Sequence, residues 1–128
     1  GDLAVRSADA SCPCGRREGL TLERVVGRAA DVTVTRDGRR MTVADADAVL
    51  AEIPGVRGFQ IDQAATGEIR VRICRSPLAG TDVLRTVEKT LERAYDFPVM
   101  AEAVPALEHE LSGKIRLARR ASGQGAEI

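Results

Sequence analysis

The stretch GFQIDQAATGEIRVRI, residues 58–73, decides the fold of this chain. From residue 68 onward, polar and apolar side chains alternate with the period of a β-strand that has one buried face. We therefore predict that the apolar residues of this strand face a core and that its arginines face water. A second strand is predicted over residues 58–62, and Ala65-Thr66-Gly67 forms the turn between the two strands.

Helices are predicted on both sides of these strands. Thr42 and Asp45 have the spacing of a capping box, and an apolar stripe follows them up to Ile53, where Pro54-Gly55 ends the helix. A second helix is expected from Thr81, a good N-cap residue, to about Ala94. A third core strand is expected over residues 99–104.

The order helix, strand, strand, helix, strand predicts an α+β fold: a small, mostly antiparallel three-stranded sheet with two helices on one face. A β-hairpin precedes it, because residues 32–35 alternate and run into the turn signal Asp37-Gly38, with a return strand over 39–43. Residues 114–119 alternate again and form either a terminal strand or an extended arm.

The chain divides into three predicted segments. Residues 1–27 are a loop-rich lead-in and hinge approach in which short strands are the only regular pattern, residues 28–121 form the α+β domain, and residues 122–128 are expected to be a flexible, Gly-containing tail. The length of 128 residues is typical of a single domain.

Composition excludes several classes of function. Nineteen Lys and Arg residues balance nineteen Asp and Glu residues, which argues against nucleic-acid binding, and aromatic residues are too few for stacking on bases. The apolar runs are far shorter than the ~20 residues that span a bilayer, and no secretory signal is visible, so neither a membrane nor a secreted location is expected.

The three cysteines do not form a disulfide framework. Cys12-Pro13-Cys14-Gly15 is read as a turn with reduced thiols, which favours a reducing, cytoplasmic compartment. A zinc site would need Cys12, Cys14, Cys74 and the single His109 to be gathered by the fold, and their spacing fits known zinc patterns poorly, so no metal site is predicted.

One lysine is the strongest candidate for chemistry. The chain has only two lysines, and Lys114 directly follows a glycine at the start of an alternating segment. A lysine on a mobile loop brings a positive point charge to an anionic group such as a phosphate. The alternative is an ordinary exposed lysine at a strand end. His109, between two glutamates, is read as a solvated loop residue.

Short motifs along the whole chain resemble the C-terminal portion of the adenylate-forming acyl- and aryl-CoA ligases, and look closest to the branch of phenylacetate-CoA ligase and coenzyme F390 synthetase. Gly1-Asp2-Leu3 resembles the family's "GD-L" motif, and residues 12–16 resemble its "C-x-C-G-R" insertion. The other matching segments are the hinge-like VGRAAD of residues 26–31, the strand entry GVRGFQI of residues 55–61, and SGKIR of residues 112–116, which resembles a terminal "GK-x-R" motif.

The resemblance implies a role for individual residues. Asp2 would bind the ATP ribose, Arg28 would lie near the nucleotide, and Lys114 would contact the substrate carboxylate and the α-phosphate during adenylation. Ala30 and Asp31 would lie at the hinge about which the domain swings between an adenylation and a thioester-forming pose. The family's pivot residue is usually Asp or Lys, whereas this chain has Ala30.

The implied activity needs a second body. ATP with Mg²⁺, CoA and a small carboxylic acid would be bound together with a large N-terminal adenylation domain, fused or in trans, and we expect no activity from these residues alone. The chain is then either a truncated domain or a natural small protein. Two alternatives remain: a non-catalytic ferredoxin-like regulatory or ligand-binding module, and a scaffold that docks through residues 2–26.

Overall fold

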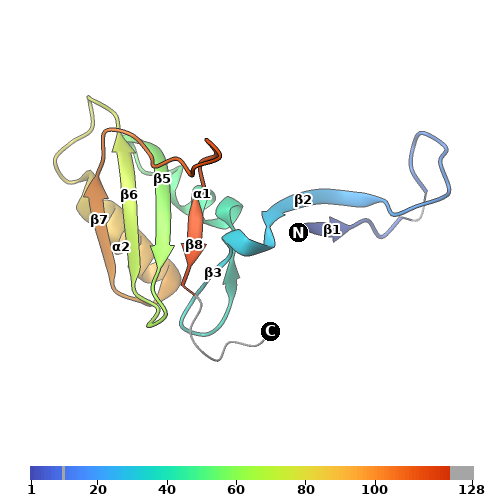
Figure 1. Ribbon diagram of the computed structural model, residues 1–128, viewed down its shortest axis with the longest axis horizontal. Helices are drawn as coiled ribbons and strands as arrows, with labels where there is room; N and C mark the ends of the chain where they lie inside the picture. Colours follow the sequence, from blue (N-terminus) through green and yellow to red (C-terminus); the bar gives the residue numbers. More distant parts are fainter. Residues whose placement is uncertain (10, 122–128) are drawn as a thin grey trace.

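The computed structural model describes residues 1–9 and 11–121, and the predicted tail at 122–128 lies outside them. Figure 1 shows a body built on one sheet and a long two-stranded ribbon that projects from it. The sheet of the body has four strands in the order β7, β6, β5, β8. These strands are β5 (Val56–Gln63), β6 (Ile69–Arg75), β7 (Val99–Ala103) and β8 (Ala118–Arg120).

The α+β class is confirmed, and the main sheet is one strand wider than predicted. β5 and β6 form the expected antiparallel pair, with Ile61 opposite Val71. β7 adds to β6 in parallel, and β8 adds to β5 in parallel. Of residues 114–119, which were predicted as either a terminal strand or an extended arm, only the last two lie in a strand, β8, and Ile115 forms an isolated bridge with His109. Antiparallel pairing prevails across the three sheets of the described residues.

Two helices cover one face of the sheet, as predicted (Figure 1). α1 (Val43–Leu50) begins at Thr42, whose hydroxyl accepts from the backbone N–H of Asp45 while the Asp45 carboxylate accepts from the Thr42 N–H, so the capping box is confirmed. α1 ends earlier than expected, and Ile53 is buried in the turn that follows. α2 (Val83–Tyr95) has Asp82 at its N-cap with no side-chain capping bond, so the expected Thr81 cap was wrong.

The core lies between the helices and the inner face of the sheet. Alternation places Ile69, Val71 and Ile73 in this core, each at most 2% exposed, as the sequence predicts. Burial of this aliphatic surface is the main stabilising term of the fold. The helices contribute Ala46, Leu50, Val83, Val87, Leu91 and Tyr95.

A small hairpin closes one end of the core. β3 (Thr33–Val34) and β4 (Arg40–Met41) pair antiparallel around the predicted Asp37-Gly38 turn, and the return strand is shorter than predicted. Buried Tyr95 shares a 2.8 Å hydrogen bond with the Thr33 hydroxyl. Burial raises the pKa of this phenol, because the charged form would lose its hydration. The hairpin is thus fastened to the end of α2.

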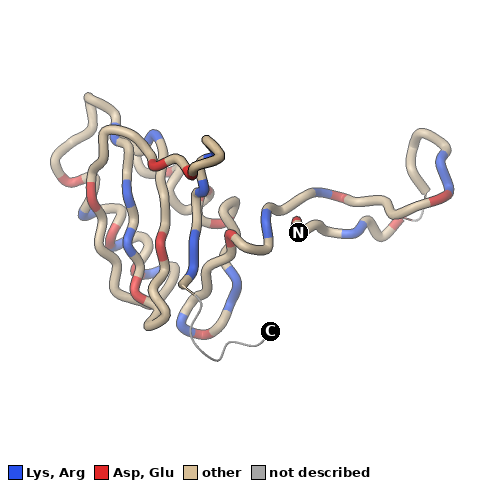
Figure 2. The backbone as a smooth tube through the Cα atoms, in the orientation of Figure 1, with Lys and Arg blue, Asp and Glu red and all other residues tan. Residues whose placement is uncertain are grey.

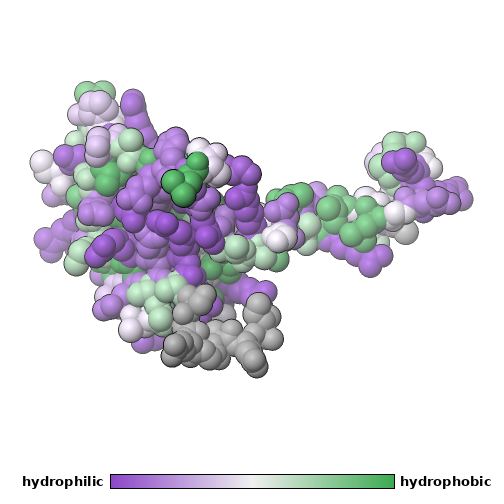
Figure 3. Space-filling model, in the orientation of Figure 1, coloured by the Kyte–Doolittle hydropathy of each residue, from purple (hydrophilic) through white to green (hydrophobic). Residues whose placement is uncertain are grey.

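The ribbon consists of β1 (Asp2–Arg6) and β2 (Leu22–Arg28), paired antiparallel. A single 3-10 turn, η1 (Ala29–Asp31), joins it to the body. Figure 3 shows apolar surface along the ribbon, where Leu22 and Val25 are exposed. No helix in the described residues has the length and apolar character needed to cross a membrane.

Candidate functional site

The loop that carries Lys114, residues 109–115, is a tight hairpin and is called the lysine loop below. His109 and Ile115 form its antiparallel bridge, the Gly113 N–H donates to the Glu110 carbonyl at 2.8 Å, and the Glu110 N–H donates to the Lys114 carbonyl at 2.8 Å. Gly113 has a φ of +80°, a left-handed conformation that favours glycine. The turn therefore fixes the backbone immediately before Lys114.

The side chain of Lys114 is available to a ligand. Lys114 is exposed, and its ammonium makes no hydrogen bond or ion pair with any described residue. His109 is held within the same loop, where its Nδ1 lies 3.2 Å from the Gly113 carbonyl oxygen. An exposed, uncommitted ammonium on a defined turn is able to approach an anion held by another body.

A buried glutamine anchors the base of this hairpin. Gln60 is 3% exposed, and its Nε2 donates to the carbonyl oxygens of Glu108 at 2.8 Å and Arg116 at 3.1 Å. The Gln60 Oε1 accepts from the Glu108 N–H at 2.8 Å. One side chain of β5 thus holds both arms of the lysine loop. Gln60 was missed as a site-building residue, because alternation alone places it on the outer face.

Arg116 connects the lysine loop to the predicted hinge. Its Nε donates to the Asp31 carboxylate at 2.8 Å, and its Nη2 donates to the Ala30 carbonyl at 2.7 Å. Asp31 is buried, with only 12% of its side chain exposed. The fold therefore brings Ala30 and Asp31 into contact with the segment of Lys114.

Asp2 and Arg28 lie at the root of the ribbon. They are opposite each other in the β1–β2 register, and the Ala29 N–H donates to the Gly1 carbonyl at 3.0 Å. Both residues are exposed. No hydrogen bond or ion pair among the described residues joins either of them to Lys114. The predicted site residues thus form two groups, the ribbon root and the lysine loop, and Arg116 links the second group to the hinge between them.

The sheet face that the helices leave uncovered carries most of the charged network. Figure 2 shows basic and acidic residues side by side along the strands of the body. Asp62 accepts from Arg72 at 2.6 Å and from Arg119 at 2.8 Å, and Arg72 also lies 2.9 Å from Glu108. These pairs offset one another's charge and hold the segment after β7 against β5 and β6.

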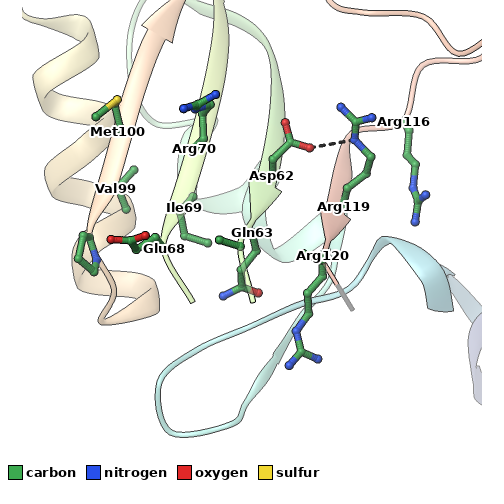
Figure 4. Close-up of a pocket in the computed structure, with 13 residues that line it drawn as sticks. Asp62, Gln63, Glu68, Ile69, Arg70, Val99, Met100, Arg116, Arg119 and Arg120 are labelled. Atoms are coloured by element: carbon green, nitrogen blue, oxygen red, sulfur yellow. Dashed lines mark hydrogen bonds and ion pairs between the residues drawn. The ribbon is translucent and has the colours of Figure 1, made fainter. Parts of the chain in front are cut away.

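A hollow of about 720 Å³ opens on the same face (Figure 4). Arg70 and Met100 come from β6 and β7, and Arg119 from β8 pairs with Asp62 inside the hollow. Arg116 and Arg120 also line it. The mixture of guanidinium groups and apolar side chains suits an anionic ligand with an apolar portion. This hollow is therefore the feature that favours the alternative of a non-catalytic ligand-binding module.

The two cysteines of the CPCG turn lie in the loop at the ribbon tip. The Sγ atoms of Cys12 and Cys14 are 2.9 Å apart, and the hydrogen bond between them lowers the pKa of Cys14. Cys74 lies in β6 and His109 in the lysine loop. Within residues 1–9 and 11–121, no group of three or more His, Cys, Asp or Glu side chains is placed to bind a metal ion, so the four zinc candidates are not gathered.

Neither a family model nor a curated protein matches this sequence. Solved structures do match the fold. A 2-hydroxyisobutyryl-CoA ligase in the postadenylation state, in complex with 2-HIB-AMP, is similar over 97% of this chain and 28% of that chain, with a TM-score of 0.59 and 23% identity.

Two further ligases give the same result. Apo MatB from Rhodopseudomonas palustris is similar over 78% of this chain and 23% of its own, with a TM-score of 0.56 and 17% identity. The anthranilate CoA ligase AuaEII in complex with anthranoyl-AMP is similar over 75% of this chain and 19% of its own, with a TM-score of 0.55 and 19% identity. The chain therefore has the fold of a portion of these acyl- and aryl-CoA ligases, and it spans less than a third of their length.

Proposed function

We propose that this chain is the mobile C-terminal domain of an ATP-dependent carboxylic acid:CoA ligase and that Lys114 is its catalytic residue for adenylation. The observation that carries the proposal is the placement of Lys114, exposed and without a described partner, on a hairpin fastened to the body by Gln60. The fold shared with acyl- and aryl-CoA ligases over most of this chain supports the same function.

The proposed chemistry uses Lys114 as a fixed positive charge. In adenylation, a carboxylate oxygen forms a bond to the α-phosphorus of ATP while the bond to pyrophosphate breaks. Negative charge gathers on the oxygens around phosphorus, and an ammonium aimed at them stabilises the transition state more than the ground state. Lys114 keeps its proton throughout and forms no covalent bond.

The remaining predicted residues have supporting roles in this proposal. Asp2 contacts the ribose hydroxyls, Arg28 lies near the nucleotide, and Ala30 and Asp31 form the hinge. Their shared location at the root of the ribbon supports this division, in which residues 1–27 approach the hinge and residues 28–121 move as the lid. The described part of the chain offers no cluster of metal ligands, so Mg²⁺ is expected to be held by ATP and the large domain.

For the acid, we propose an arylacetate of the phenylacetate type, because the C-P-C-G-R stretch at residues 12–16 resembles the insertion of the phenylacetate-CoA ligase branch. The complete ligase, in which this chain acts with its large domain, is expected to show a kcat/KM for phenylacetate at least about tenfold above that for 2-hydroxyisobutyrate, because one misfitting group in an acid pocket changes this ratio about 10–200-fold. Acid-dependent ATP–pyrophosphate exchange measures it. A preference for the hydroxy acid would reject the branch and leave the ligase proposal standing.

The alternative function is a non-catalytic ligand-binding module, and the arginine-lined hollow is the feature that favours it. Isothermal titration of ATP into the purified chain separates the two functions. We expect no heat of binding at ATP concentrations up to about 1 mM, because the purine and phosphate pockets belong to the large domain. Micromolar binding that is lost in Arg70→Ala would instead support the module.

A further inference from the structure

Arg116 holds the hinge and the lysine loop at the same time. We infer that Arg116 is a positioning residue that clamps the body side of the hinge through its bonds to Ala30 and Asp31. Backbone rotation is then confined to the residues before the Ala30–Asp31 peptide bond. Lys114 moves together with this clamp as one rigid unit. This inference rests on the proposed function, because it states how the adenylation lysine keeps a fixed position relative to the hinge.

The clamp acts on one peptide plane. The guanidinium donates through Nη2 to the Ala30 carbonyl at 2.7 Å and through Nε to the Asp31 carboxylate at 2.8 Å. The Ala30 carbonyl and the Asp31 N–H belong to the same rigid peptide unit. Rotation about the φ and ψ bonds of Ala30 moves the ribbon without breaking either bond, whereas rotation after Asp31 would pull the carboxylate from Arg116.

The chemistry of the three residues suits this task. Ala30 has no polar side chain, so only its main chain is available to be held. Asp31 is buried, and its ion pair with Arg116 is only partly open to water, since 12% and 30% of the two side chains are exposed. The guanidinium fork reaches two acceptors at once, which a lysine ammonium on a flexible stem does not reproduce.

The clamp also limits the movement of Lys114. A single residue separates Lys114 from Arg116, and that residue, Ile115, pairs with His109 across the hairpin. The main chain at Arg116 is held independently, because its carbonyl accepts from Gln60 at 3.1 Å. Lys114 is therefore two residues from Arg116, whose main chain is bonded to β5 and whose side chain is bonded to the hinge.

The first experiment measures the clamp in this chain alone. Arg116→Lys is expected to raise amide hydrogen exchange about tenfold in both the 29–32 and the 109–117 peptides, while the peptides of β5 and β6 are unchanged. Arg119→Lys is the matched control, since Arg119 pairs with Asp62 on the outer face and does not touch the hinge. Faster exchange in only one of the two segments would overturn the clamp.

The second experiment measures its consequence in the complete ligase. Arg116→Lys is expected to lower the kcat of adenylation about tenfold with the KM for ATP nearly unchanged, because the ammonium is displaced and not removed. In a Lys114→Ala background the same substitution should have no further effect, since Arg116 acts through Lys114. Independent, multiplicative losses would overturn the positioning role. Full activity of Lys114→Ala alone would reject the proposed function, and the exchange experiment would still decide the clamp.

Discussion

Lys114→Ala is expected to lower acid-dependent ATP–pyrophosphate exchange by the complete ligase about 10²–10³-fold, the usual loss when one fixed electrostatic group is removed from a transition state. The loss should fall on kcat, because the ammonium faces charge that grows during the reaction. Folding should be unaffected: Lys114 is exposed and makes no hydrogen bond or ion pair with the described residues. Thermal unfolding of the variant checks this point.

Lys89→Ala is the matched control, since Lys89 is the other lysine of the chain and lies exposed on α2. The substitution removes the same charge from the same domain, at a place where the proposal assigns no role. The rate of ATP–pyrophosphate exchange should stay within about twofold of the parent, because surface substitutions usually have small effects. Equal activity of the two variants and the parent would reject Lys114 as the catalytic residue.

The sequence predicts local structure well where a few neighbouring residues decide it. The alternation of residues 68–73 identifies β6 and its buried face, and the spacing of Thr42 and Asp45 identifies the start of α1. These signals depend on periodicity and on side chains that bond to their own backbone. β8 is harder, because three residues pair with a strand more than fifty positions earlier.

The site was predictable only in part. Lys114 stands out because lysine is rare in this chain and because a glycine precedes it, and both signals are local. The partners that hold its loop are distant: Gln60 reaches Arg116 across 56 positions, and Arg116 reaches Asp31 across 85. Alternation says which residues face outward on a strand, and it does not say that a later segment will cover them. Gln60 is buried for that reason, under the segment of Glu108 and Arg116.

Gln60→Leu should destabilise the domain by about 2–4 kcal/mol and release the lysine loop. Leucine keeps the volume of the buried side chain, but the Glu108 N–H and the carbonyls of Glu108 and Arg116 lose their partner. Each unsatisfied buried group costs about 1–3 kcal/mol, and the total stays below the sum because the loop can turn some of these groups toward water. Chemical unfolding measures the stability of the chain.

Leu91→Ala separates loss of the loop anchor from loss of stability. Leu91 is fully buried on α2 and does not contact the segment of Lys114. Its truncation is expected to lower the free energy of unfolding by about 2–5 kcal/mol, a range that includes the loss expected for Gln60→Leu. At a temperature where both variants stay folded, only Gln60→Leu should lower adenylation, by about tenfold, because a displaced ammonium no longer meets the developing charge. Equal rates in the two variants would mean that the loop needs no anchor, and that the distant bond from β5 serves stability alone.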